Sequence, residues 1–252
     1  MTNTLTNYFD RQFTVHTSRT MMYRELSHIM DYIHAGKSPD EAAQDNVAGK
    51  LTQKNQKTTY NQLKKLYSLH DAFPPFVCFS YFWNKTIDDL KPLLTFLYAA
   101  AMDYMLAGCM ETVIALPPGE ELPGKKLAAM LGITYPGKYT DKTRLSSAQN
   151  ILSSFKQAGF FTTGAKNIRL AVNPDYTVTA FAFLMAYLSG LRGSYAMESP
   201  FVRMLGVSPD RLLRLAMEAG YHGMMDYKQS GGVITLRFDQ LFKELGIYGI
   251  ES

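Results

Sequence analysis

Positively charged side chains are concentrated in one part of this 252-residue chain. Residues 122–172 hold eight lysine and arginine residues against a single acid, Asp141, so their formal charge is +7, whereas the whole chain carries only +4. Such side chains neutralise phosphate groups, and their concentration is typical of a surface that binds a nucleic-acid backbone. An ordinary solvated basic surface is the alternative. The eight residues are Lys125, Lys126, Lys138, Lys142, Arg144, Lys156, Lys166 and Arg169.

The same run has the pattern of a winged helix-turn-helix. The spacing predicts a short helix over residues 125–131 and a longer helix over residues 140–158, with Thr140 as its N-cap. A hairpin is predicted for residues 160–172, because two short apolar runs flank a glycine-containing turn. The apolar face of the longer helix is predicted to hold Leu145, Ala148, Ile151, Leu152 and Phe155.

Away from its apolar face, the longer helix carries side chains suited to reading DNA. Arginine, asparagine and glutamine form paired hydrogen bonds with base edges, and small hydroxyl groups let a helix approach the groove closely. The predicted contacts are Lys142, Arg144, Ser147, Asn150 and Lys156 on the helix, and Lys166, Asn167 and Arg169 on the hairpin. The same polar face also includes Ser146, Gln149, Ser153, Ser154 and Gln157. The alternative is a winged helix that binds only protein.

A second basic segment lies nearer the N-terminus. Ser38, Pro39 and Glu41 have the spacing of a capping box, which predicts a short helix there, and another helix is expected through Leu69. Residues 46–70 contain five lysines and no acid, which suggests a helix-turn-helix without a wing. An ordinary solvated face is the alternative. The predicted phosphate contacts in this segment are Lys54, Lys57, Lys64 and Lys65.

Three parts are predicted along a mainly α-helical chain. Residues 1–116 form a helical region, residues 117–175 the basic winged helix, and residues 176–252 a linking helix with a second winged-helix-like unit. The Pro117-Pro118-Gly119 step marks the first boundary. The second unit repeats the order of short helix, capped helix and small hairpin, but acids dilute its basic residues. A protein contact or dimerisation surface is therefore expected there rather than a second DNA reader.

Signals for catalysis, metals and cofactors are absent from the sequence. The five histidines are scattered, and no phosphate-binding glycine loop or nucleophile elbow occurs. Asp103 and Glu111 are expected to cap or pair within a helical bundle rather than to act as catalytic carboxylates. The sequence therefore predicts a protein that is not an enzyme and has no cofactor. No small-molecule ligand is inferred.

Two further features bear on location. The apolar run over residues 93–116 has the length of a membrane span, but Asp103 and Glu111 lie inside it, and a mid-bilayer charge costs roughly 2.5–3.5 kcal/mol. A buried helix is expected instead. Cys78 and Cys109 lie in apolar surroundings, as buried thiols do in a reducing compartment. We therefore expect a cytoplasmic protein with no membrane partner.

Several segments together carry a family resemblance. They are the basic residues 50–65 after Asn46, with Thr58-Thr59 among them, the helix expected over residues 98–116, and residues 140–161, which end in Ala158-Gly159-Phe160-Phe161. With these, the chain resembles the BrxA-like components of bacterial BREX phage-defence systems over about residues 18–238. The resemblance implies a non-enzymatic protein that binds duplex DNA with modest sequence preference. It also implies partner proteins, namely a methyltransferase, ATPases and a phosphatase-like protein.

The first hypothesis is therefore a protein that binds double-stranded DNA with low sequence specificity in bacteriophage defence. One alternative is an adaptor whose winged helices bind other defence-system proteins. The other alternative is a winged-helix transcriptional repressor, which differs from the first hypothesis in its specificity for one operator.

Overall fold

The computed structural model describes residues 8–9, 12–230 and 233–250, and these residues are mainly helical, as the sequence predicts. The first half contains α1 Tyr23–His34, α2 Pro39–Gln44, α3 Gln53–Tyr67, α4 Pro74–Lys85, the 3-10 turn η1 Asp88–Leu90, α5 Lys91–Met102 and α6 Tyr104–Ile114. The second half contains α7 Gly124–Thr134, α8 Asp141–Gln157, α9 Tyr176–Leu188, α10 Ser194–Met197, α11 Pro200–Arg203, α12 Pro209–Tyr221, β1 Asp226–Ser230, β2 Val233–Arg237 and α13 Asp239–Glu244.

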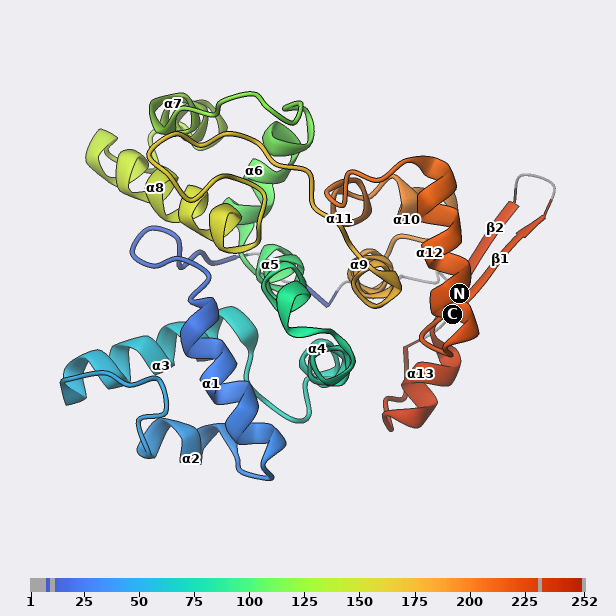
Figure 1. Ribbon diagram of the computed structural model, residues 1–252. Helices are drawn as coiled ribbons and strands as arrows, with labels where there is room; N and C mark the ends of the chain where they lie inside the picture. Colours follow the sequence, from blue (N-terminus) through green and yellow to red (C-terminus); the bar gives the residue numbers. More distant parts are fainter. Residues whose placement is uncertain (1–7, 10–11, 231–232, 251–252) are drawn as a thin grey trace.

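Two helices, α5 and α9, form the centre of the molecule (Figure 1). Every residue of α9 from Thr177 to Leu188 is buried, which is the property of a helix that is apolar all round. Around this centre lie α1–α3 on one side, α6–α8 on a second and α10–α13 with the hairpin on a third. One continuous cluster of buried apolar side chains runs through all three predicted parts of the chain.

The apolar run of residues 93–116 is broken at Asp103. This carboxylate accepts hydrogen bonds from the backbone N–H of Met105 (2.9 Å) and of Leu106 (3.1 Å), so it begins α6 as an N-cap. Within the described residues, no single helix is long and apolar enough to cross a membrane, and the pair that reaches this length together bends by 119° at this break.

The basic run folds around α7 and α8, which pack against each other. The Thr140 hydroxyl accepts a hydrogen bond from Thr143 N–H (3.2 Å), so the predicted N-cap of α8 is confirmed. The expected hairpin of residues 160–172 is reduced to a single antiparallel bridge between Phe161 and Arg169. A further bridge joins Ile168 to Glu121, so residues 119–122 pair with the strand that the sequence assigned to the hairpin alone.

The C-terminal part keeps the predicted order of elements. The short helix α11 is followed by α12, whose N-cap Ser208 accepts from Arg211 N–H, and by the antiparallel pair β1–β2. Strand β1 runs from Asp226, which faces Arg237, to Ser230, which faces Val233. The sequence predicts the turn of this hairpin at Ser230-Gly231-Gly232, of which Gly231 and Gly232 lie outside the described residues.

The N-terminal part departs from prediction before its first helix. Apolar residues recur at helical spacing from residue 18 to residue 33, which predicts a helix there, but α1 begins at Tyr23. Residues 14–22 instead run across α8 as a non-helical segment, with a turn at residues 15–18, that we call the strap. Met22 at its end has a left-handed φ of 53°. The predicted capping box of α2 is present, because Glu41 N–H donates to the Ser38 hydroxyl and Ser38 N–H donates to the Glu41 carboxylate.

Candidate nucleic-acid interface

The solvent-facing side of α8 is a narrow stripe of mainly polar residues. Its members recur at helical spacing and are exposed or half-buried: Lys142, Leu145, Ser146, Gln149, Ser153 and Lys156. Leu145 was predicted to be in the core, but its side chain is 45% exposed. The buried side of α8 is completed instead by Ser147 and Ser154, which lie beside Ile151.

Two predicted contacts are not at the surface. Ser147 is fully buried on the inner side of α8, and Arg169 is only 5% exposed. The Arg169 guanidinium donates to the carbonyls of Val113 (3.3 Å), Phe160 (3.5 Å) and Leu170. The sequence of a helix or a short strand does not show which of its polar residues points inward. Ser147 and Arg169 are therefore not part of the candidate DNA-binding surface.

Three more predicted residues are held by contacts within the protein. Arg144 donates to the carbonyl of Tyr139 (3.1 Å) and pairs with the Asp141 carboxylate, so it fixes the turn before α8. Asn150 donates to the carbonyl of His16 (3.0 Å), and Asn167 donates to the carbonyl of Leu122 (2.8 Å). These bonds compete with any contact that the same amides and guanidinium could make to base edges.

Two lysines extend the α8 surface toward the loop of residues 163–166. Lys156 donates to the carbonyl of Gly164 (2.8 Å), which ties the end of α8 to this loop, and Lys166 is exposed on it. Together with Lys142, they are the predicted lysine contacts of residues 122–172, and all three remain at least partly open to solvent.

The strap covers one flank of α8. The Ser154 hydroxyl accepts from Met21 N–H (2.8 Å), and the Gln157 side chain accepts from Tyr23 N–H (3.3 Å). Ser154 and Gln157, which the sequence placed on the polar face, therefore bind the protein's own backbone. The covered flank lies beside the exposed stripe and leaves that stripe open.

A buried network of an aspartate, a histidine and a serine anchors the strap. His16 Nδ1 lies 2.8 Å from Asp103 Oδ2, and His16 Nε2 lies 2.9 Å from Ser154 Oγ. These are the contacts of a hydrolase triad, but none of the three side chains is exposed, so no substrate reaches the hydroxyl. We interpret the network as structural, with the strap as the element that it holds.

The Asp103 carboxylate is stabilised in its ionised form. Burial raises its pKa, but the His16 ring and hydrogen bonds from His16, Leu106 and Val15 outweigh burial, so the pKa lies below the ordinary value of 3.8. The carboxylate also accepts from Thr14 Oγ1 (2.9 Å) and Val15 N–H (2.7 Å). One side chain therefore joins the start of the strap to the start of α6.

Lys138, in the turn between α7 and α8, lies among three tyrosine rings. Its Nζ is 4.3 Å from the ring centroid of Tyr104 and 5.8 Å from those of Tyr135 and Tyr139. Burial, more than any other cause, raises the pKa of both Tyr135 and Tyr139 to about 12, so both rings stay neutral at pH 7. Lys138 is thus held by ring faces and stabilises the turn.

Replacing Lys138 by methionine is expected to lower the free energy of unfolding by about 1 kcal/mol, because cation–π contacts at partly exposed sites contribute about 0.5–1 kcal/mol each. Lys142→Met, four residues along the chain, is the matched control, since Lys142 has no such contact among the described residues. That control is expected to change stability by less than about 0.5 kcal/mol. Urea denaturation compares the two, and equal losses would contradict a role for the rings.

The second basic surface is the exposed side of α3. Lys54, Lys57, Lys64 and Lys65 are all exposed there. Lys64 Nζ lies 3.5 Å from the Asp40 carboxylate, a solvent-exposed pair of small energetic weight, and Lys65 Nζ lies 5.0 Å from the centre of the Phe13 ring. All four lysines therefore remain accessible to phosphate groups.

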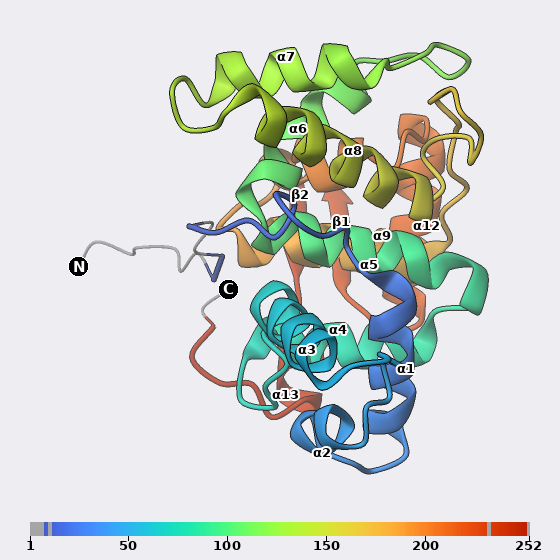
Figure 2. The ribbon, with the colours of Figure 1, turned by 90° about the vertical axis from the view of Figure 1, so that its left-hand side faces the viewer.

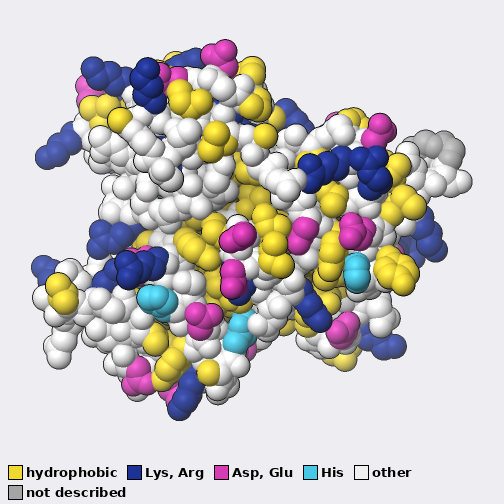
Figure 3. Space-filling view, in the orientation of Figure 1, with side chains coloured by type: hydrophobic (Ala, Val, Ile, Leu, Met, Phe, Trp, Pro, Cys, Tyr) yellow, Lys and Arg dark blue, Asp and Glu magenta, His cyan; other side chains and the backbone are white. Residues whose placement is uncertain are grey.

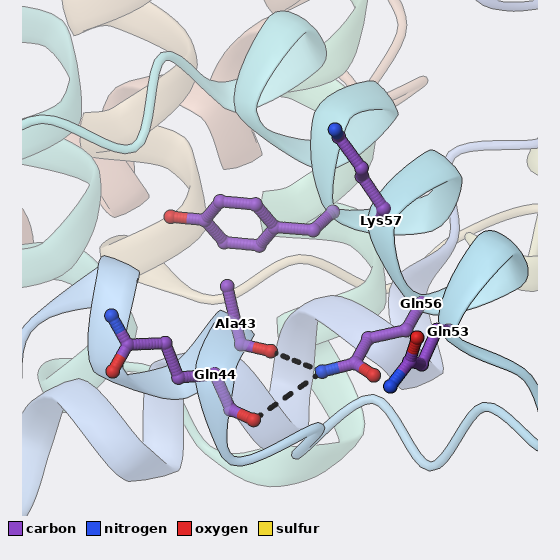
Figure 4. Close-up of a pocket in the computed structure, with 6 residues that line it drawn as sticks. Ala43, Gln44, Gln53, Gln56 and Lys57 are labelled. Carbon is purple, nitrogen blue, oxygen red and sulfur yellow. Dashed lines mark hydrogen bonds between the residues drawn. The ribbon is translucent and has the colours of Figure 1, made fainter.

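The corner between α2 and α3 is hollowed beside these lysines. A hollow of about 200 Å³ is lined by Ala43 and Gln44 from α2 and by Gln53, Gln56 and Lys57 from α3, with Tyr60 as its sixth residue. The Gln56 amide donates to the carbonyls of Ala43 (2.6 Å) and Gln44 (3.4 Å), and Lys57 points away from these bonds (Figure 4). Gln56 thus joins α3 to α2, and Lys57 forms no ion pair or hydrogen bond with the described residues.

The two basic surfaces lie on the same side of the molecule. In Figure 2, α8 and α3 both face the viewer, one above the other, with the strap and α5 between them. Lys and Arg side chains gather along the corresponding left-hand edge in Figure 3. Helices α3 and α8, which are separated by more than 70 residues in the sequence, therefore lie on the same side of the molecule.

Comparisons with known proteins assign neither a family nor a function to the chain. No family matches the chain, and neither the curated proteins nor the solved structures contain a match to it. Within the described ranges, no group of three or more histidine, cysteine or acidic side chains is arranged to hold a metal ion.

Proposed function

We propose that this protein binds double-stranded DNA through one face formed by α3, α8 and the loop of residues 163–166. The observation that supports the proposal most directly is that two separate helices with exposed lysines, α3 and α8, lie on the same side of the molecule, where Lys and Arg side chains gather (Figures 2 and 3). A duplex laid on this face would meet Lys54, Lys57, Lys142 and Lys166, whose charges would neutralise its phosphates.

The surroundings of α8 support the proposal that it is the recognition helix of a winged helix. The elements around α8 follow the order of a winged helix, which here is α6, residues 119–122, α7, α8, residues 160–162 and residues 167–170. The backbone N–H of Leu122 donates to the carbonyl of Asn167 (2.9 Å), and that of Leu170 donates to the carbonyl of Phe160 (2.8 Å). In this proposal, residues 163–166 are the wing.

Low sequence specificity is proposed because few base-reading groups remain free. Arg144 and Asn150 are held by backbone carbonyls, so Gln149 is the one member of the exposed α8 stripe that has a side-chain amide for a paired contact to adenine. Ser146 and Ser153 beside it can bond to phosphates or to bases. Lysines, which position a protein without reading sequence, dominate the rest of the surface.

The resemblance to BrxA-like proteins suggests the biological setting. We propose that the protein acts without catalysis in a BREX-like bacteriophage defence system in the cytoplasm, together with other defence-system proteins. In this proposal, the fully buried Asp103–His16–Ser154 network anchors the strap and takes no part in a reaction.

Competition between duplexes of unrelated sequence tests the proposed low sequence specificity. A labelled duplex of about 30 base pairs is displaced by unlabelled duplexes of several unrelated sequences, and their affinities are expected to agree within about tenfold. One sequence that competes about 10³-fold better than the others would contradict low specificity and favour the repressor. Failure of every duplex to compete would contradict DNA binding itself.

A role as a protein-binding adaptor is favoured by one separate observation. The outer side of α12 exposes large apolar side chains, with Met217 60% and Tyr221 89% accessible. Exposed aromatic and methionine side chains are enriched at protein interfaces. If this surface binds a defence protein, a stable partner is expected to co-purify after nuclease and high-salt washes, and Tyr221→Ser is expected to release it, whereas Lys142→Gln is not.

A further inference from the structure

The base of the proposed wing contains a buried positive charge that no acidic side chain balances. Arg169 lies between two bridged segments and is 5% exposed, and its hydrogen bonds go to backbone carbonyls. Within the described part of the chain, no carboxylate forms an ion pair with it. Buried charges normally have a partner of opposite sign, so this guanidinium differs from most buried arginines.

Backbone groups offset this charge only in part. The carbonyl of Val113 belongs to the last turn of α6, and a helix C-terminus carries roughly half a negative charge. Burial also lowers the pKa of Arg169 from its ordinary value, although an arginine remains charged at pH 7. The site is therefore short of negative charge when nothing else binds there.

Arg169 also lines a cavity of about 270 Å³ together with a second arginine, Arg203 of α11. The remaining walls are mostly apolar and include Leu116, Pro118 and Val172. Arg203 Nη1 donates to both carboxylate oxygens of Glu111 (2.8 and 3.0 Å), but this pair is about half exposed and uses one of its nitrogens. The two arginines and Glu111 together leave the cavity with one net positive charge.

We propose that this cavity binds a small carboxylic acid with an apolar body. The carboxylate would accept hydrogen bonds from Arg169 and Arg203, and the apolar part would lie against Leu116, Pro118 and Val172. A monoanion matches the net charge of the site, and the volume of about 270 Å³, just below the roughly 300–1,000 Å³ typical of ligand sites, suits a small molecule. The proposal does not depend on DNA binding.

Calorimetric titration of the full chain with sodium benzoate tests the site, with benzamide as the neutral probe of the same shape. Saturable benzoate binding is expected, and benzamide is expected to bind at least about tenfold more weakly, because it lacks the charge that the arginines bind. Inorganic phosphate, which lacks an apolar body, is expected to bind more weakly than benzoate. Phosphate binding as tight as that of benzoate would overturn the proposal.

Substitutions inside and outside the cavity test where the carboxylic acid binds. Arg203→Met and Val172→Phe, which remove a charge and fill the cavity respectively, are each expected to weaken benzoate binding about tenfold or more. Arg214→Met, an exposed arginine of α12 outside the cavity, is the control and is expected to leave binding unchanged. Absence of saturable benzoate binding to the natural chain, or equal binding to all three variants, would overturn the proposal.

Discussion

Replacing Asp103 by alanine is expected to lower the free energy of unfolding by about 3–5 kcal/mol, which makes it one of the most damaging single substitutions in the chain. The carboxylate begins α6, accepts two bonds from the strap and lies 2.8 Å from the His16 ring. Its removal leaves several buried donors without an acceptor at once. Urea denaturation followed by circular dichroism measures the loss.

Glu111→Ala is the matched control for this prediction. Glu111 lies eight residues further along in the same helix, and its ion pair with Arg203 is about half exposed, so its removal is expected to cost less than about 1 kcal/mol. Similar losses for the two variants would show that Asp103 does not organise the strap.

The pH dependence of stability follows from the lowered pKa of Asp103. A carboxyl whose pKa is lower in the folded state than in the unfolded state stabilises the fold above its unfolded pKa, about 3.9. That contribution is lost as the pH falls through the folded-state pKa. The natural chain is therefore expected to lose stability below about pH 4 more steeply than Asp103→Asn, as acid titration at fixed urea would show.

Replacing Lys54, Lys57, Lys142 and Lys166 together by glutamine is expected to weaken duplex binding by about 10²–10³-fold at about 150 mM salt. All four side chains are exposed on the proposed face, and each phosphate contact contributes roughly a factor of five through counterion release. The slope of log K against log salt should become shallower by about 0.9 for each lysine that contacts a phosphate. Fluorescence polarisation measures both quantities.

The control variant loses the same number of positive charges at positions outside the proposed face. Lys85, Arg214, Lys228 and Lys243 lie outside α3, α8 and residues 163–166, so their joint replacement by glutamine lowers the net charge equally. This variant is expected to bind DNA nearly as well as the natural chain. Equal losses in the two variants would mean that net charge, rather than the proposed face, attracts the duplex.

Helix boundaries were predictable where a local hydrogen bond determines them. Ser38 and Thr140, which the sequence predicts as caps, each accept a bond from the backbone three residues later, and so does Ser208, which precedes Pro209 as Ser38 precedes Pro39. Such caps need no distant partner, so a short window of sequence contains the information. The mainly helical character of the chain was predictable for the same reason.

Features that depend on distant contacts were not predictable. The strap follows an apolar pattern that suggests a helix, but Asp103 and Ser154, some 80–140 residues away, bind its backbone instead. Leu145 was expected inside because of its type, and Arg169 outside because of its charge, yet the packing of α7 and the bridged segments places them the other way round. No single-sequence signal distinguishes these cases.

The exposure of the lysines at the candidate site was predictable from the sequence, but the positions of the polar side chains that could contact bases were not. Lys54, Lys57, Lys142 and Lys166 are exposed, as a basic cluster usually is, because a lysine rarely finds a buried partner. Asn150 and Asn167 looked equally available in the sequence, but their short amides satisfy backbone carbonyls inside the fold. Whether any of these residues contacts DNA stays a prediction.

The salt dependence of duplex binding tests the central proposal most directly. Polarisation of a labelled random-sequence duplex of about 30 base pairs is measured from about 50 to 300 mM salt. Binding at micromolar concentration or tighter, with a slope of roughly −4 to −7 in log K against log salt, is the result that a lysine-bearing face on α3 and α8 predicts. Absence of binding at the lowest salt would contradict the proposal and leave this face as a surface for protein partners.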